Sequence, residues 1–318
     1  MTEATAMIEA AAHPSSLDSD FPLRPFAIRH QLAGHPLFKL PRIIELLRML
    51  PRDQIEANSG QVQIGQDPDT MPLFEMEPEE IIRRLETASA WMVLKRVEAD
   101  PAYKAVLEEA LLAVARQKGY SSIRQAGFHD IRGFLFVSSP NSTTPLHLDA
   151  EDNIFAHIHG EKFFTIFDNT DSSIASRDAV ERAITQHRNL AYDSAFDAKS
   201  VCHRLLPGDG VFVPYLWPHW VRTGDSHSVS LAITWKTKAV IRNNDLLVCN
   251  SMLRRIGFPQ PAPGQYPALD RMKSGSLGLL RSIVEPLRKL QMIRVMLRRI
   301  AFGRNANYYL KTWTKPVA

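Results

Sequence analysis

The chain has 318 residues, of which 45% are hydrophobic, 23% charged and 8% aromatic. This composition is ordinary for a globular protein, and it excludes a wholly disordered chain, a collagen-like chain and a small disulfide scaffold. The formal charge of +4 is too small to indicate a nucleic-acid-binding protein by itself. We expect no membrane span and no signal peptide, and the two cysteines favour a reducing compartment, the cytoplasm.

The first 130 residues fall into two parts. Residues 1–20 are rich in Ala, Ser and Thr and are expected to form a mobile tail. Residues 21–130 have the apolar spacing of a mainly helical N-terminal region. Its expected helices are 42–50, which Pro51 ends, 77–85, and 101–118, which Gly119 ends.

The pattern changes to short β-branched and aromatic runs over residues 131–240, which predicts a sandwich or barrel of strands. The expected strands lie within 133–138, 153–167, 210–213 and 228–236. Residues 168–200 are expected to be an insertion, helical around 179–187. Residues 241–318 form a C-terminal helical extension, with a basic amphipathic segment over 277–302 that is broken near Pro286.

One short segment carries the strongest chemical signal. His147 and Asp149 are two residues apart, so on a strand their imidazole and carboxylate would face the same side. His219, which follows the turn and strand of residues 207–214, is the natural third ligand. Two histidines and one carboxylate leave a metal's opposite face open, which suits Fe(II) better than a closed structural zinc site. Taken alone, the His147–Asp149 pair could equally be two surface side chains on one strand.

Three ordered segments carry a resemblance to a known family: 144–149 (Thr-Pro-Leu-His-Leu-Asp), 152–162 and 207–219. Together they resemble the JmjC or cupin-like (cupin 8) family of Fe(II)/2-oxoglutarate-dependent oxygenases. The most similar branch includes the asparaginyl hydroxylase of hypoxia-inducible factor. The resemblance spans about 131–238. It implies an α+β fold, with a double-stranded β-helix (jelly-roll) core and helical additions at both ends.

The resemblance also implies roles for individual residues. By position, the iron ligands and catalytic centre are His147, Asp149 and His219. The distal carboxylate of 2-oxoglutarate would be bound by Lys162. A buried ammonium needs an anion, and a dicarboxylate whose other end is on the metal supplies one.

Further residues complete the expected co-substrate site. Thr144 matches a hydroxyl-bearing position of the family, and Asn153 matches a polar position that lines the site, although it could instead satisfy local backbone. The tyrosine that often completes this site in relatives cannot be placed, because the expected strand offers only Phe134 or Phe136. A hydroxyl from the last strand could compensate, and Ser230 is assigned this role over the alternatives Ser228 and Thr234.

Two other histidines lie close to Lys162 in sequence. If Lys162 faces the cavity, continuous strand alternation also turns Ile158 and Gly160 inward and His157 and His159 outward. We therefore do not expect these two histidines to be ligands.

The expected activity is hydroxylation of a protein side chain or small molecule, with 2-oxoglutarate and O₂ as co-substrates and an unidentified primary substrate. Two alternatives remain open: a JmjC-type demethylase, and a non-catalytic binding or regulatory protein on a cupin fold. The basic C-terminal helix is expected to pack on its own core or form a homodimer. Contact with an anionic membrane is a less favoured interpretation, and nucleic acid is not an expected partner.

Overall fold

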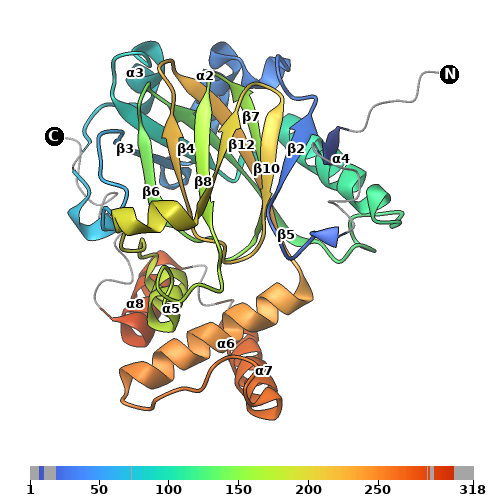
Figure 1. Cartoon of the computed structure of the whole chain (residues 1–318), viewed down its shortest axis with the longest axis vertical. Helices are drawn as coiled ribbons and strands as arrows, with labels where there is room; N and C mark the ends of the chain where they lie inside the picture. Colours follow the sequence, from blue (N-terminus) through green and yellow to red (C-terminus); the bar gives the residue numbers. More distant parts are fainter. Residues whose placement is uncertain (1–6, 11–18, 73, 285, 287–289, 304–318) are drawn as a thin grey trace.

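The computed structural model describes residues 7–10, 19–72, 74–284, 286 and 290–303. Its centre consists of two antiparallel β-sheets that face each other (Figure 1). The large sheet has the strand order β1-β2-β10-β7-β12-β5-β4-β3, and the small sheet has the order β6-β11-β8-β9. This is the jelly-roll core of the α+β fold expected from the sequence.

The strands of the large sheet are β1 (Ile8–Ala10), β2 (Phe26–His30), β3 (Ile55–Ser59), β4 (Ala90–Lys95), β5 (His129–Ser138), β7 (Asp152–His159), β10 (Asp209–Val213) and β12 (Ser228–Lys236). The strands of the small sheet are β6 (Thr143–His147), β8 (Lys162–Phe167), β9 (Ser200–Leu205) and β11 (His219–Thr223). Each strand expected in residues 131–240 is present, and 153–167 is a hairpin of two strands.

An apolar layer fills the space between the two sheets. Phe155 pairs with Val211 on one side and with Ala232 on the other, and antiparallel partners direct their side chains to the same face. These side chains pack against Phe164 and Val221 of the small sheet. The side chains that alternate with them point away from this interior.

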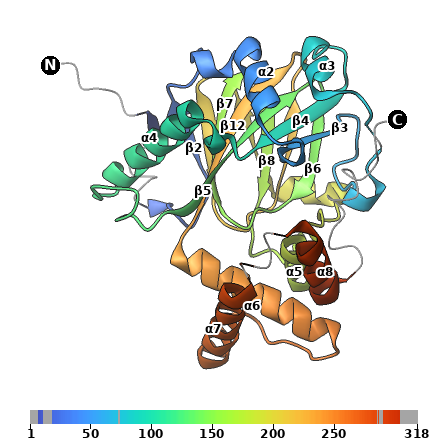
Figure 2. The same cartoon turned by 180° about the vertical axis from the view of Figure 1, so that it is seen from behind.

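Helices cover the outer face of the large sheet, as Figure 2 shows from behind. They are α2 (Leu40–Met49), α3 (Pro78–Arg83) and α4 (Pro101–Gln117). The cap of α4 explains where it begins, because the Asp100 side chain accepts a hydrogen bond from the Ala102 amide. The insertion, which contains α5 (Arg177–Gln186), covers the outer face of the small sheet through residues such as Ile174 and Leu190.

Three further helices follow the last strand: α6 (Lys238–Arg255), α7 (Pro267–Val284) and α8 (Gln291–Phe302). They lie beyond one end of the two sheets (Figure 1). The expected helix over 277–302 is interrupted as predicted, but its first part begins earlier, at Pro267. In the part of the chain that the structure describes, no helix has the length and apolar character needed to cross a bilayer.

The N-terminal half differs from the expectation. The prediction of a mainly helical region over 21–130 missed β2, β3 and β4, all of which join the large sheet. Part of the expected tail is also a strand, because Ile8 is buried and β1 pairs with β2. Residues 1–6 and 11–18 of that tail lie outside the described residues. The missed strands are short, and long-range pairing rather than local pattern determines them.

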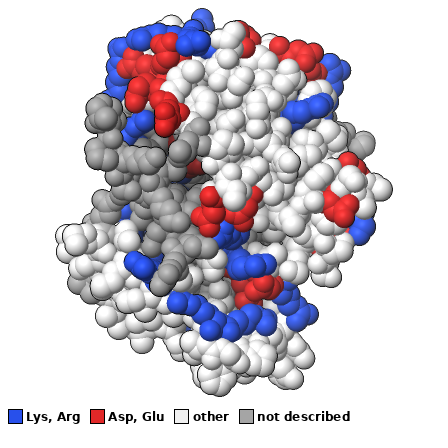
Figure 3. Space-filling view, turned by 90° about the vertical axis from the view of Figure 1, so that its left-hand side faces the viewer, with Lys and Arg blue, Asp and Glu red and all other residues white. Residues whose placement is uncertain are grey.

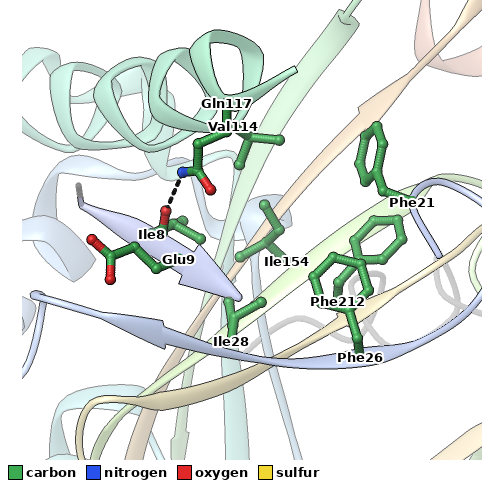
Figure 4. Close-up of a pocket in the computed structure, with 9 residues that line it drawn as sticks. All are labelled: Ile8, Glu9, Phe21, Phe26, Ile28, Val114, Gln117, Ile154 and Phe212. Atoms are coloured by element: carbon green, nitrogen blue, oxygen red, sulfur yellow. Dashed lines mark hydrogen bonds between the residues drawn. The ribbon is translucent and has the colours of Figure 1, made fainter. Parts of the chain in front are cut away.

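A small apolar cavity of about 10 Å³ lies on the outer side of the large sheet (Figure 4). It has room for about one water molecule. The Gln117 side chain closes one side of it by donating a hydrogen bond of 2.6 Å to the Ile8 carbonyl. The other lining residues are Glu9, Phe21, Phe26, Ile28, Val114, Ile154 and Phe212. The cavity is therefore a packing gap on the side of the sheet opposite to the interior.

Candidate metal centre and anion pocket

Three side chains meet at one end of the interior. His147 ends β6 and pairs across the sheet with His219, the first residue of β11, and Asp149 follows two residues after His147. Asp149 Oδ1 lies 3.9 Å from His147 Nε2, and Asp149 Oδ2 lies 3.7 Å from His219 Nε2. One donor atom from each residue lies within 4.8 Å of the other two. The structure thus brings together the three residues expected to form the metal site.

Backbone carbonyls fix the tautomer of both imidazoles. His147 Nδ1 lies 2.7 Å from the Pro145 carbonyl, and His219 Nδ1 lies 2.9 Å from the Trp217 carbonyl. Because a carbonyl can only accept, each Nδ1 carries a proton, and in the neutral ring Nε2 then presents a lone pair. Burial, and then the nearby His147, lower the pKa of His219 to about 4, so its ring is neutral near pH 7.

This donor set fits a divalent cation. Two imidazole lone pairs and a carboxylate directed at one another are mutually repulsive unless a cation lies between them. Three protein donors would leave further positions of such an ion open for other ligands. Two histidines and one carboxylate in this arrangement are typical of non-haem Fe(II) sites.

Neighbouring side chains hold this centre in place. The ring of Phe164 stacks on that of His219, with centroids 5.0 Å apart and an interplanar angle of 17°. Asn153 Nδ2 donates to Asp149 Oδ2 at 3.3 Å. Asn153 Oδ1 is buried and has no hydrogen-bond partner among the described residues. The Asn153 amide therefore orients the carboxylate and still has an acceptor available for a ligand.

A β-bulge brings Thr144 to the interior face. His147 pairs with His219, but Thr144 pairs with Val221, so β6 advances three residues where β11 advances two. Val221 belongs to the apolar layer between the sheets, and paired residues share a face. Thr144 and His147 therefore face the same interior although they are three residues apart, which simple alternation does not allow.

Lys162 lies at the other end of the interior, and its residue is only 3% exposed. Among the described residues its hydrogen-bond partner is Ser230, whose Oγ is 3.3 Å from Lys162 Nζ. The ring centroids of Phe136 and Phe155 lie 5.9 and 5.5 Å from the same nitrogen. Burial lowers the pKa of Lys162 to about 7. No carboxylate of the described residues lies against this amino group, so the pocket is suited to an anionic ligand, which would stabilise the protonated form.

The positions of the expected compensating hydroxyls are now distinct. Ser230 contacts Lys162, whereas Ser228 Oγ is buried without a hydrogen-bond partner among the described residues. Thr234 pairs with Asn153, at the metal end. Phe136 lies on the strand where the tyrosine of relatives was sought, and it offers Lys162 only an aromatic face.

The expectation that His157 faces away from the pocket is wrong. Its ring is fully buried, and its Nδ1 lies 3.0 Å from Ser230 Oγ, the same atom that Lys162 contacts. The error has a physical cause: the turn at Gly160, where φ is +81°, separates β7 from β8, so alternation does not continue to Lys162. His157 is not part of the metal trio, and His159 is exposed and packs on His227.

A family model for a cupin-like domain matches residues 75–239, more than half of the chain. The chain belongs to the cupin-like family. The cupin-like domain begins well before residue 131, so it includes β4 and α4, which the sequence pattern alone places in a separate N-terminal region. The match does not single out the branch of the asparaginyl hydroxylase, and that closer similarity stays a prediction.

The comparison with solved structures gives matches of low identity, three of which follow. The X-ray structure of E. coli ycfD is 14% identical over 87% of this chain and 69% of its own, with a TM-score of 0.46. The E. coli ribosomal oxygenase YcfD in complex with cobalt and succinic acid is 13% identical, with coverages of 92% and 72% and a TM-score of 0.40. Oxalate decarboxylase from Bacillus subtilis at pH 4.6 is 19% identical, with coverages of 34% and 22% and a TM-score of 0.24. No curated protein matches the chain.

Proposed function

We propose that this cupin-like protein is an Fe(II)- and 2-oxoglutarate-dependent dioxygenase that hydroxylates a protein side chain or a small molecule. His147, Asp149 and His219 hold the iron in this proposal, and Lys162 binds the distal carboxylate of 2-oxoglutarate. The supporting observation is the pairing of the two sites in one interior. A three-donor centre lies at one end, and a buried lysine lies at the other.

Different residues act at the two ends of the bound co-substrate, the end at the metal and the end at Lys162. Bound Fe(II) supplies the chemistry that couples oxidative decarboxylation of 2-oxoglutarate to hydroxylation of a second substrate. In this proposal Thr144 contributes a hydroxyl to the co-substrate site, and Ser230 contacts Lys162. Asn153 holds the Asp149 carboxylate in its ligating orientation. The aromatic rings of Phe136 and Phe155 exclude water around Lys162, which strengthens its attraction for a carboxylate.

The test is succinate release from 2-oxoglutarate by protein reconstituted with Fe(II) under air. Succinate should form only with both Fe(II) and 2-oxoglutarate present, and Lys162→Met should abolish it. If the reconstituted protein neither forms succinate nor binds 2-oxoglutarate under anaerobic conditions, the proposal is wrong and a non-catalytic role is favoured. With a cell extract as substrate source, formaldehyde release would identify demethylation, whereas incorporation of ¹⁸O from O₂ without formaldehyde would identify hydroxylation.

We also propose that the C-terminal helices form a homodimer contact. Met292, Met296 and Ile300 lie along one side of α8 and are 85%, 54% and 66% exposed. Leu279 and Ile283 of α7 are similarly exposed. Lys and Arg form a band over one face at the level of the C-terminal helices, next to a surface without charge (Figure 3).

Several arginines of these helices are already used within the protein. Arg254 pairs with Glu181, Arg281 pairs with Asp245, and Arg298 donates to the Thr185 carbonyl at 2.9 Å. Cations held in this way are less available for lipid or nucleic-acid phosphates. The exposed apolar side chains of α8 would be buried by contact with a partner, and a second copy of the chain offers a matching apolar surface.

Light scattering of Met296→Glu tests the dimer. This variant should be monomeric at a concentration where the unaltered protein is dimeric. Leu23→Glu is the matched control, because Leu23 is 73% exposed at a different surface and its replacement should leave the dimer intact. A monomeric unaltered protein that sediments with anionic vesicles would contradict the proposal and favour a membrane contact.

The free thiols of Cys202 and Cys249 support a cytoplasmic location, where thiols stay reduced.

A further inference from the structure

We propose that His157 is a positioning residue for Lys162 and acts through the Ser230 hydroxyl. The inference rests on the proposed use of Lys162 as the site of the co-substrate carboxylate. Ser230 Oγ lies between the two groups, 3.0 Å from His157 Nδ1 and 3.3 Å from Lys162 Nζ. All three residues are buried, at 0%, 0% and 3% exposure for His157, Ser230 and Lys162.

The donor and the acceptor of each hydrogen bond that links Gly160, His157, Ser230 and Lys162 can be assigned. His157 Nε2 lies 2.9 Å from the Gly160 carbonyl, which can only accept, so Nε2 carries the proton. Burial, and then the positive charge of Lys162, lower the pKa of His157 to about 3, so the ring is neutral. His157 Nδ1 is therefore an acceptor, and the Ser230 hydroxyl donates a hydrogen bond to it. The Ser230 oxygen then accepts from the Lys162 ammonium.

The backbone that carries His157 is itself fixed. Its carbonyl accepts hydrogen bonds from the Gly208 amide at 3.0 Å and from His30 Nε2 at 3.0 Å. His30 Nε2 also lies 3.0 Å from the Asp209 carbonyl, and His30 Nδ1 accepts from the Leu32 amide at 3.1 Å. The His157 ring thus has a defined position from which to orient Ser230.

This arrangement limits what Ser230 can do in the pocket. Its single proton is committed to His157, so it cannot donate to a bound carboxylate and serves only to hold Lys162. An ammonium has three N–H bonds, of which one points to Ser230 and two remain for the anion. Without an acceptor at the His157 position, the Ser230 hydroxyl is free to rotate and Lys162 loses its fixed orientation. The expected result is weaker binding of 2-oxoglutarate with little change in the chemistry at the metal end.

Two variants of His157 separate this role from simple packing. His157→Asn places an amide oxygen close to the position of Nδ1, so Ser230 keeps an acceptor. His157→Gln reaches the position of Nε2, so it keeps the donor to Gly160 but leaves Ser230 without an acceptor. Calorimetric titration of 2-oxoglutarate into Zn(II)-loaded protein should give a Kd about tenfold higher for His157→Gln. The Kd of His157→Asn should stay within about threefold of the unaltered protein.

A double-mutant cycle then tests whether the effect passes through Ser230. Ser230→Ala should raise the Kd by a similar factor, and adding His157→Gln to it should cause no further rise. In turnover assays the loss should be in KM for 2-oxoglutarate, with kcat retained. Equal losses in His157→Asn and His157→Gln, or additive effects in the double variant, would overturn the inference and leave His157 a packing residue.

A readout without co-substrate keeps this inference separable from the proposed function. The ¹⁵N chemical shift of Lys162 Nζ can be followed against pH in the Zn(II)-loaded protein. His157→Gln should move its titration midpoint, whereas His157→Asn should not. If the shift behaves as expected but the unaltered protein does not bind 2-oxoglutarate, His157 does position Lys162 and the proposed function is wrong. If His157→Gln leaves the titration unchanged, the positioning role of His157 is wrong.

Discussion

The two ends of the barrel interior are built in different ways. At the metal end, His147 and His219 are each oriented by the carbonyl two residues before them, Pro145 and Trp217. At the other end, Lys162 is oriented by Ser230, 68 positions away in sequence. The first arrangement is local to each ligand's own segment, whereas the second is assembled from separate strands.

This difference has a chemical consequence. Carbonyl acceptors next to each histidine fix the imidazole tautomer as soon as the segment adopts its local conformation. The Lys162 pocket forms only when β7, β8 and β12 have packed, because His157, Lys162 and Ser230 lie on three different strands. We therefore expect substitutions at the metal end to affect the metal selectively, and those at the lysine end to affect both co-substrate binding and stability.

The largest expected effect is at the metal end. Asp149→Ala removes the only carboxylate of the trio and leaves the two imidazoles. Loss of an outer-sphere partner typically lowers metal affinity by about 10- to 100-fold, so loss of a ligand should lower it by more than about a hundredfold. Calorimetry with Mn(II), which accepts the same nitrogen and oxygen ligands, measures the change.

Glu151→Gln is the matched control for Asp149→Ala. Glu151 is a carboxylate two residues further on, and it pairs with Lys236 at 3.3 Å rather than with the histidines. Its substitution should leave the affinity for Mn(II) within a few fold of that of the unaltered protein. If Glu151→Gln weakens Mn(II) binding as strongly as Asp149→Ala, the assigned trio is not the metal site.

The second effect is at the lysine end and depends on pH. Burial lowers the pKa of Lys162 from 10.5 to about 7, so between these pH values the unfolded chain binds a proton that the folded protein does not. The contribution of Lys162 to the free energy of unfolding should therefore increase with pH over that range, by about 1.4 kcal/mol per pH unit. Below pH 7 both states carry the proton and this slope vanishes.

Lys162→Met isolates that contribution, because other groups titrate in the same range in both proteins. The free energy of unfolding of the unaltered protein minus that of Lys162→Met should rise from pH 7 to pH 9.5 in urea titrations. The variant should also lose about a hundredfold in affinity for 2-oxoglutarate. A difference in unfolding free energy that stays constant with pH would show that Lys162 is not a desolvated cation.

The same contrast explains what sequence alone could predict. The trio His147, Asp149 and His219 belongs to short motifs with local geometry, so spacing suggested it and the resemblance to the family singled it out. The inward orientation of His157 depends on the turn at Gly160, which ends one strand and begins another within a stretch that had been expected as a single β segment. Strands β2, β3 and β4 were missed for a related reason: their pairing partners are far away in sequence and their own patterns are short.

The position of Thr144 depends both on a local motif and on the pairing of two strands. Its place three residues before His147 was assigned by resemblance, and alternation along a strand would put the two on opposite faces. The bulge between the β6 and β11 registers resolves this conflict, because it adds one residue to β6 between Thr144 and His147. Such a bulge depends on the pairing of two strands and leaves no clear signal in either one.

The smallest expected effect on metal affinity is at Asn153, whose side chain donates a hydrogen bond to one of the expected ligands. Asn153 donates to Asp149 Oδ2 at 3.3 Å, and Asn153→Ala removes this donor but no ligand. Mn(II) affinity should fall by about tenfold, well below the loss in Asp149→Ala. Thr234→Val is a matched control, because Thr234 pairs with Asn153 on the same face and valine keeps its shape. If both variants weaken Mn(II) binding equally, packing around the centre, rather than the Asn153 hydrogen bond, orients Asp149. If only Asn153→Ala does so, the orientation of the carboxylate is set by β7, the same strand that presents His157 to the lysine end.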